Sequence, residues 1–414
     1  MLVYFEHNNL FKEQQFGFRP GRSTEQSINL ITETIKENKR QHKFTLVTTR
    51  DVEKAFDKLW HQGLIYKLNN QYKIEIDFIA IIHNYLINRI IAPYFNNIKG
   101  PTFTPLAGVP QGSCLGPILF IIFVNDVPSP LYNNTIIAQF ADDMVHVVRS
   151  DQTNINRIEN AKRKLKNELK HTDLWEKNWK IKTNADKTKI GIFGTNIEHF
   201  ESQGGIQINN MPVSIAASIK ILGYLIDNNL NSVNHIKSTT SIALRQLMKL
   251  NRFSQAPPNI KLHLYKALVL PHLEYPSIQI HNSLKTYKSM IQKIQNKALR
   301  WVYNINLNER ITTSSIHEKA KIDPINVRLA KLTVKQLYKM REAFFEDQSP
   351  EISYLKTVTL TDYFNQNDPI KPKKESLASK INSHIFQPHL DFQINIKNLP
   401  EQREDFPIPL PIYK

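Results

Sequence analysis

Cysteine is almost absent from this chain of 414 residues, which contains only Cys114. A single cysteine cannot form a disulfide within the chain, and it excludes a cysteine-based zinc site. A reducing compartment is the simplest inference from this composition. We interpret Cys114 itself as a small packed residue rather than a nucleophile.

Long apolar runs are missing as well. The longest, residues 114–124, is too short to span a bilayer and is interrupted by Pro117, so it predicts a buried helix. The N-terminus lacks the basic-then-apolar layout of a secretory signal. We therefore expect no membrane partner.

Acidic residues are few compared with basic ones. The chain has 37 Asp and Glu against 54 Lys and Arg, which gives a formal net charge of +17. This excess suits a polyanionic partner such as nucleic acid, although some basic proteins bind none. Hydrophobic residues make up 41% of the chain, which is enough for a sizeable core.

The most informative segment that is present is Gln139-Phe140-Ala141-Asp142-Asp143. Its apolar flanks predict two short strands, with the acidic pair at the tight turn between them. Two adjacent carboxylates in an apolar setting need compensation, and a divalent metal such as Mg²⁺ is the usual form. The alternative is an exposed turn in which Asp is merely a favourable turn residue.

A third carboxylate follows another predicted strand. Asp51 comes at the end of the apolar run at residues 44–47, and pairing of the strands would bring it beside Asp142 and Asp143. Three carboxylates at one place can form a two-metal site for in-line phosphoryl transfer. Between the acidic elements lies the segment Pro110-Gln111-Gly112-Ser113.

Taken in order, these segments resemble the reverse transcriptase of non-LTR (LINE-type) retrotransposons, with jockey-like features. The resemblance runs through most of the chain. It is carried by residues 15–24, 51–57, 60–61, 110–113, 140–143, 175, 179, 184–188, 222–224, 264–266, 271, 275 and 295–300.

The resemblance implies an α+β fold, that of a right-hand polymerase. The palm, an antiparallel sheet with packed helices, would occupy residues 41–227, after a partial fingers region at 1–40. A helical thumb and post-thumb region would follow at 228–346, and a Pro-rich, partly irregular tail at 347–414.

Periodicity and turn signals predict the individual elements. Ser23 and Gln26 form a plausible capping box for a helix whose face carries Ile28, Ile31 and Ile35. Further helices are expected at 58–70, 76–88, 115–125 and 155–178. Strands are expected at 45–50, 136–140, 144–148, 189–193 and 220–225, with a small hairpin at 206–208 and 213–215.

The resemblance also assigns catalytic roles. Asp51 and Asp142 would be the principal ligands of two Mg²⁺ (or Mn²⁺) ions, with Asp143 assisting. Lys187 would protonate the leaving pyrophosphate, or else is an exposed lysine in a turn. Asp57 is the weaker candidate ligand, since it fits the start of a helix.

Nucleotide binding is implied for four residues. Phe56 would lie under the sugar, where its ring would clash with a 2′-hydroxyl; the alternative is a core phenylalanine. Gln111 could touch nucleotide or template, and Gly112 would allow close backbone approach. Arg19, together with Arg22, could meet phosphates of the nucleotide or the nucleic acid.

Later segments are implied to hold nucleic acid. Leu222, Gly223 and Tyr224 resemble the primer grip. Basic residues on the helices that follow are candidate phosphate contacts or ordinary solvated surface: Lys249, Arg252, Lys293, Lys297 and Arg300. Trp175 and Trp179 are expected in the core.

Two features depart from the family pattern. Arg50 precedes a proposed metal ligand and would compete with the metals for Asp51, unless it faces the opposite side of the strand. The family's basic fingers hairpin would lie upstream of residue 1, as would its endonuclease, and no RNase H signature follows. We therefore expect a fragment that polymerises poorly.

The function implied is RNA-directed DNA synthesis with an RNA template, a DNA primer and deoxynucleotides. The alternatives are a catalytically silent nucleic-acid-binding relic or domesticated protein, and an RNA-dependent RNA polymerase. Phe56 and the Pro110-Gln111-Gly112 segment favour the first over the last. Target-primed synthesis in the family implies the nucleus, with the cytoplasm as an alternative; the oligomeric state is left open.

Overall fold

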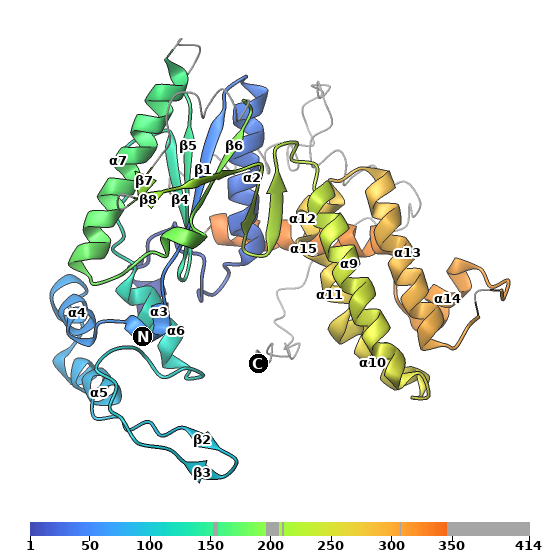
Figure 1. Cartoon of the computed structure of the whole chain (residues 1–414), viewed down its shortest axis with the longest axis horizontal. Coiled ribbons are helices and arrows are strands. Elements are labelled where there is room, and N and C mark those ends of the chain that lie inside the picture. The colour runs from blue at the N-terminus through green and yellow to red at the C-terminus, as the bar shows by residue number, and fades with distance from the viewer. Residues whose placement is uncertain (152–155, 196–206, 209–210, 307, 346–414) are drawn as a thin grey trace.

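The computed structural model describes residues 1–151, 156–195, 207–208, 211–306 and 308–345. A sheet flanked by helices forms one side of the molecule, and a bundle of helices forms the other (Figure 1). The predicted tail at 347–414 lies outside the described residues, and the domain boundaries expected from the sequence stay predictions.

The central sheet has five described strands in the order β4-β5-β1-β6-β9. Their bounds are β1 Thr45–Asp51, β4 Thr135–Phe140, β5 Asp143–Arg149, β6 Lys189–Phe193 and β9 Ser214–Ala216. Neighbours are antiparallel except β6 and β9, which are parallel. Four of these strands confirm the sequence prediction to within a residue at each end.

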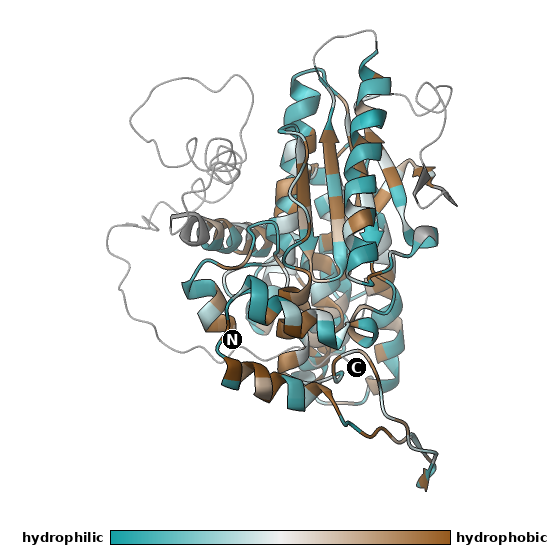
Figure 2. Ribbon diagram, turned by 90° about the vertical axis from the view of Figure 1, so that its left-hand side faces the viewer, coloured by the Kyte–Doolittle hydropathy of each residue, from teal (hydrophilic) through white to brown (hydrophobic). Residues whose placement is uncertain are grey.

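Alternating side chains divide this sheet between two long helices. Val47 and Val147 pack with α2 (Thr24–Arg40), whereas Leu46 and Val148 pack with α7 (Arg157–Asn178). Figure 2 shows the apolar strands between these helices, whose outer surfaces are largely hydrophilic. The predicted capping box of Ser23 and Gln26 is confirmed, as is burial of the isoleucine face.

A second layer of short helices carries the segment between β1 and β4. It comprises α3 Ala55–Lys58, α4 His61–Tyr66, a π-helical turn η1 Lys67–Gln71, α5 Ile76–Leu86 and α6 Leu115–Phe123. The single helix predicted at 58–70 is wrong, because Trp60 is extended and starts a new helix at His61. A hairpin of β2 (Tyr94–Phe95) and β3 (Ile98–Lys99) projects from this layer with exposed aromatic residues.

The strand predicted at 220–225 is also wrong. It is a hairpin of β10 (Ser218–Ile221) and β11 (Tyr224–Asp227), and Leu222 and Gly223 form its turn with φ values of 47° and 85°. A two-residue turn of this type needs positive φ at both positions, and leucine gave no signal for one of them. A small hairpin of β7 (Gln207–Ile208) and β8 (Met211–Pro212) replaces the broader one predicted there.

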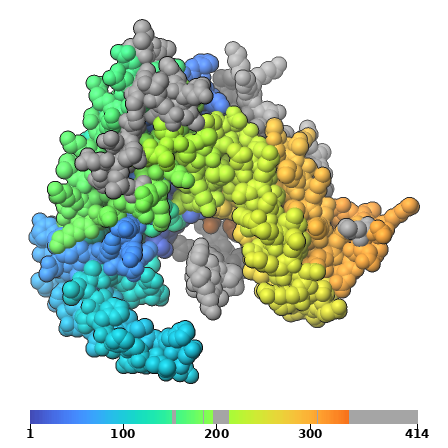
Figure 3. All heavy atoms as spheres, viewed as in Figure 1, coloured from blue at the N-terminus to red at the C-terminus, as the bar shows by residue number. Residues whose placement is uncertain are grey.

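The helical side has its own apolar core, which includes Ile236, Tyr265, Leu299 and Leu329. Its helices are α9 Val233–Leu250, α10 Pro258–Leu268, α11 Leu270–Glu274, α12 Ser277–His281, α13 Lys285–Val302, α14 Thr313–Ala320 and α15 Ile325–Phe345. A hollow separates α9 and α10 from the layer that carries the β2–β3 hairpin (Figure 3). A lipid bilayer could not be crossed by any helix in the described ranges, because each is too short or too polar.

Candidate active site

The ends of β1 and β5 bring the predicted carboxylates together. Asp51 is the register partner of Asp143, and Phe140 pairs with Asp143 across the β4–β5 turn, so Ala141 and Asp142 form that turn. Register partners in an antiparallel pair have Cα atoms about 4.5–5.5 Å apart. The predicted adjacency of these strand ends is therefore confirmed, whereas the roles of the carboxylates stay predictions.

The N-terminal segment clasps this turn. Gln15 Oε1 accepts hydrogen bonds from the backbone N–H of Ala141 at 3.0 Å and of Gly17 at 2.7 Å. A Cβ on Gly17 would lie 2.4 Å from the nitrogen of Ala141, so only glycine permits this approach. Gln15 and Gly17 belong to the segment 15–24, which the sequence marks only by its resemblance to the family, and their contact with this turn is visible only in the fold.

A loop brings Lys187 to the same place. The backbone N–H of Asn184 donates to Asp51 O at 2.8 Å, and that of Glu53 donates to Lys182 O at 2.7 Å. The 3₁₀ turn η2 (Ala185–Lys187) follows, and the Lys187 ammonium lies 2.9 Å from Asp51 Oδ2. That hydrogen bond raises the pKa of Lys187.

The carboxylates at the turn are electrostatically strained. Burial raises the pKa of Asp143 to about 6, with further contributions from the charges of Asp142 and Asp51. Burial and the Asp51 charge also raise the pKa of Asp142. Carboxylates held close together and partly buried in this way are stabilised by a nearby cation.

Phe56 lies beside the Gln111 segment. Its ring is half-buried, 5.0 Å from the ring of Phe120, and its carbonyl accepts from the Val109 N–H at 2.7 Å. Gln111 Nε2 donates to Asp57 Oδ1 at 2.8 Å. Asp57 is therefore bound to Gln111 and not grouped with the three carboxylates at the strand ends. Gly112 has φ of 81° in open space, so its glycine is required by the backbone conformation.

Comparison with known proteins supplies the family. The family model described as reverse transcriptase (RNA-dependent DNA polymerase) matches residues 1–226, more than half of the chain. The chain belongs to the reverse transcriptase family. All of the strand-end elements described above lie within the matched residues.

Relatives of this chain include proteins named as retrotransposon polymerases in Drosophila melanogaster. The chain is 27% identical over 325 residues to a "probable RNA-directed DNA polymerase from transposon X-element", covering 77% of this chain and 34% of that protein. It is 26% identical over 340 residues to the "RNA-directed DNA polymerase from mobile element jockey", covering 79% and 35%. The chain thus spans about a third of the length of these relatives.

Among solved structures, the comparison matches telomerase from Candida albicans in complex with a fragment of telomeric RNA. It has 12% identity, a TM-score of 0.40, and coverage of 78% of this chain and 58% of that chain. Apo telomerase from Candida tropicalis gives a TM-score of 0.40 at 10% identity, with coverage of 87% and 58%.

Reverse transcriptases generally use divalent metal ions. Within the described ranges, no group of three or more His, Cys, Asp or Glu side chains is placed so that it could hold a metal ion. Mg²⁺ in phosphoryl-transfer sites is instead held by one or two carboxylates together with substrate phosphates and water. The open strand ends offer oxygen ligands of this kind, and Asp51 already has a cationic partner in Lys187.

Of the two alternatives predicted for Arg50, the structure confirms the one in which its side chain faces away from Asp51. The Arg50 side chain faces α7 and is buried, where its Nη2 lies 2.6 Å from Asp173 Oδ1 and 2.7 Å from Glu176 Oε1. Strand alternation turns it to the face opposite Asp51. Arg50 is therefore a structural residue that fastens β1 to α7.

Arg19 is also engaged within the protein. Its guanidinium makes two hydrogen bonds to Glu6 and donates to Lys12 O at 3.0 Å, and its side chain is only 9% exposed. The nucleotide contact expected of Arg19 stays a prediction, and it would require this pair to open. Arg22 lies over the Phe16 ring at 5.6 Å.

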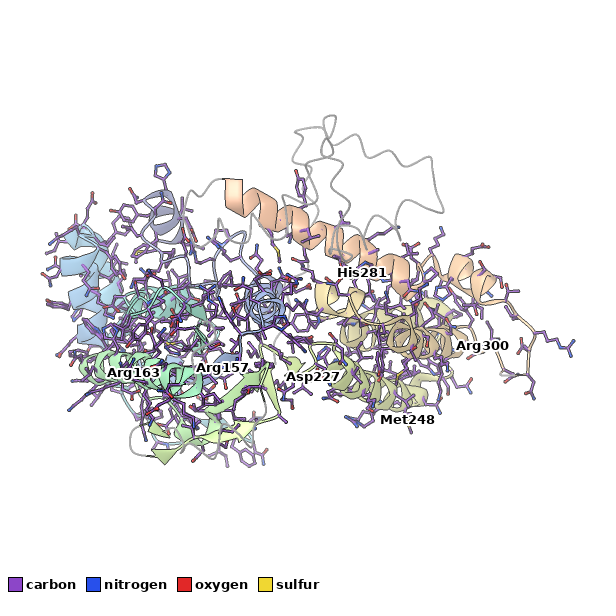
Figure 4. The ribbon with its side chains drawn as sticks, turned by 90° about the horizontal axis from the view of Figure 1, so that it is seen from above. Arg157, Arg163, Asp227, Met248, His281 and Arg300 are labelled. Carbon is purple, nitrogen blue, oxygen red and sulfur yellow. The ribbon has the colours of Figure 1, made fainter. Side chains whose placement is uncertain are left out.

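The basic residues of the helical side divide into two groups. Arg300 donates to Asn306 O at 2.8 Å and lies at the far end of the helical region from Arg157 and Arg163 of α7 (Figure 4). Its contacts to its own loop give it a structural function. The remaining candidates are exposed, as a phosphate contact requires: Lys249, Arg252, Lys293 and Lys297.

Two further side chains hold the backbone that precedes Pro110, and the sequence did not predict this contact for either of them. His61 Nε2 lies 2.7 Å from Gly108 O, to which Arg89 Nη2 also donates at 2.8 Å. These contacts hold the backbone that leads into Pro110. Cys114, expected to be packed, is exposed at the N-cap of α6, so that interpretation is wrong.

The tryptophan pair behaves as predicted. Trp175 is buried and Trp179 is partly buried against the same core. Their rings lie over the ammonium of Lys67, which also donates to Asp126. The two tryptophans therefore pack around the buried ammonium of Lys67.

Proposed function

We propose that this chain is an RNA-directed DNA polymerase domain of a non-LTR retrotransposon, which extends a DNA primer along an RNA template with deoxynucleotides. The observation that carries the proposal is the register of Asp51 opposite Asp143, with Asp142 in the adjoining turn. Family membership and the polymerase names of the relatives support it. Action in the nucleus belongs to the same proposal.

Asp51, Asp142 and Asp143 would hold two divalent ions, Mg²⁺ or Mn²⁺. When bound, such ions activate the primer 3′-hydroxyl and neutralise the triphosphate during in-line transfer. The carboxylates are held in position for this role because β1 pairs with β5 and because Gln15 accepts a hydrogen bond from the turn at Ala141. Positioning of reactants contributes much of the rate of such transfers.

Lys187 would supply a proton to the leaving pyrophosphate. Its hydrogen bond to Asp51 keeps the ammonium beside the carboxylates, and a lysine side chain is protonated at neutral pH. A group that donates a proton to the leaving pyrophosphate must be protonated before the transfer and must lie within reach of the reacting atoms.

Phe56 would select the sugar. Its ring packs against the ring of Phe120, and the next residue, Asp57, accepts a hydrogen bond from Gln111. A fixed ring at this position would exclude a 2′-hydroxyl by contact, because a packed side chain cannot yield without cost. Gln111, which is held by Asp57, and Gly112 would also contact the nucleotide.

The test is primer extension on an RNA template with labelled deoxynucleotides and Mg²⁺ or Mn²⁺. We expect incorporation that requires the divalent ion and the RNA template. Incorporation of ribonucleotides in preference would instead indicate an RNA-dependent RNA polymerase. Tight primer–template binding without incorporation would indicate a silent nucleic-acid-binding protein, and either result would overturn the proposal.

A further inference from the structure

The turn between β10 and β11 is held in a conformation that its sequence does not favour. Leu222 has φ of 47°, in the left-handed region that is unfavourable for a residue with a Cβ. Gly223 beside it is exposed, whereas Tyr224 is buried with its hydroxyl 2.8 Å from Ser232 Oγ. The exposed part of the predicted primer grip is therefore the Leu222-Gly223 turn itself.

One side chain from the helical region fastens this turn. The Tyr275 hydroxyl donates to Leu222 O at 2.6 Å, across 53 residues of sequence. A Cβ on Gly223 would lie 3.4 Å from Tyr275 Cε1, so the ring also lies against the exposed turn residue. Leu222 can keep its left-handed conformation because its carbonyl has this fixed donor.

Tyr275 is itself fixed from two sides. His235 of α9 has its Nε2 2.9 Å from Tyr275 O, and its ring packs edge-on against Tyr224 at 4.9 Å. Two residues on, the Ser277 N–H and hydroxyl both donate to Glu25 Oε2 of α2, at 3.1 and 2.7 Å. The tyrosine thus connects the turn to helices of both sides of the molecule.

We propose that Tyr275 is a positioning residue for the primer: its hydroxyl sets the Leu222-Gly223 turn, and the turn sets the primer 3′ end. This inference rests on the proposed function, in which that turn contacts the primer. Loss of the hydroxyl frees the Leu222 carbonyl and loosens the turn. Primer binding then weakens, while nucleotide binding at the Asp51 and Phe56 side is unchanged.

The test compares Tyr275→Phe with Tyr303→Phe in the full chain. Tyr303 is a matched control, because its hydroxyl donates to the backbone carbonyl of Lys319 at 3.1 Å within the helical region. Amide hydrogen exchange at residues 218–227 reports the turn without any need for activity. Primer extension then gives KM for primer, KM for deoxynucleotide and kcat.

We expect Tyr275→Phe to speed exchange at the turn and raise the primer KM about three- to ten-fold, the range of one neutral hydrogen bond. The nucleotide KM should hold, and Tyr303→Phe should change neither quantity. Unchanged exchange, an unchanged primer KM, or equal effects of the two variants would each overturn the inference. If the unsubstituted chain adds no nucleotide, the proposed function fails, while the exchange measurement still decides whether Tyr275 fixes the turn.

Discussion

The Lys187 ammonium lies 2.9 Å from Asp51 Oδ2. Lys187, from the motif at residues 184–188 of the predicted palm, therefore contacts the first of the three proposed metal ligands. The two residues are 136 positions apart, and the contact forms because the backbone at 182–184 runs beside Asp51. In this structure the cation next to the Asp51 carboxylate is Lys187. Its removal should therefore have two separable effects.

Lys187→Gln should lower the rate of nucleotide addition by about 10²-fold, the effect of losing a general acid. It should also lower the Mg²⁺ concentration that gives half-maximal rate, because Asp51 no longer has a competing cation. Single-nucleotide extension titrated with Mg²⁺ measures both. Lys182→Gln is the control, since Lys182 is exposed in the same loop and pairs with Glu53 instead. An unchanged maximal rate would leave Lys187 as an ordinary surface lysine.

Phe56→Val should relax sugar selection. The smaller side chain leaves room for a 2′-hydroxyl, so the preference for deoxynucleotides over ribonucleotides should fall by about 10- to 100-fold. Competing incorporation of the two nucleotides opposite the same template base gives the ratio directly. Phe103→Val, an exposed phenylalanine of the projecting segment, should leave the ratio intact. An unaltered ratio in Phe56→Val would make Phe56 a core residue only.

Arg50→Leu should destabilise the fold. It removes the cation between Asp173 and Glu176 and leaves two carboxylates near a buried site without compensation. Breaking a buried ion pair by removing one partner costs about 3–5 kcal/mol of unfolding free energy. Arg40→Leu breaks an exposed pair with Glu37 and should cost under about 1 kcal/mol. Denaturant unfolding of both variants tests the difference, and equal costs would contradict the structural assignment of Arg50.

Sequence reasoning succeeded where a signal is local. The period-two strands around Asp51 and Asp142 and the Ser23 capping box depend on neighbouring residues, and the structure contains them. It did not find the partners of Arg50, because Asp173 and Glu176 lie 123 and 126 residues away on another element. Leu222 was hidden for a related reason, since its positive φ is maintained by a distant tyrosine.

Site residues show the same division. The motif order suggested that the carboxylates would meet, and the strand register brings their backbones together. The internal contacts of Arg19 could not be predicted, because Glu6 becomes its neighbour only when the N-terminal segment folds back. Charge alone does not distinguish a phosphate-binding arginine from one that is paired inside the protein.

His146 should make the fold sensitive to acid. His146 is a fully buried residue of β5, and its Nε2 lies 3.1 Å from the hydroxyl of Thr172 on α7. Burial lowers the pKa of His146 to about 3. The unfolded chain binds a proton near pH 6.5, whereas the folded chain does not. The contribution of His146 to stability is therefore present above that pH and is lost as pH falls toward 3.

The measurement is the unfolding free energy between pH 7 and 4.5. Below about pH 6, His146→Gln should reduce its slope by about 1.4 kcal/mol per pH unit, the effect of one proton. His263→Gln, at an exposed position of α10, should leave the slope as it is. A slope that is the same in all three proteins would mean that His146 takes up a proton within the folded state.

The central claim is that the strand-end carboxylates carry out metal-dependent nucleotide addition. Its most direct test is the rate of adding one deoxynucleotide to a primer on an RNA template, with and without Asp142→Asn. The account predicts divalent-dependent addition that falls at least about 10²-fold in Asp142→Asn, because charge stabilisation dominates phosphoryl transfer. Asp323→Asn, which removes an exposed carboxylate of the helical side, should retain the rate. Equal rates in Asp142→Asn and the unsubstituted chain would contradict the account.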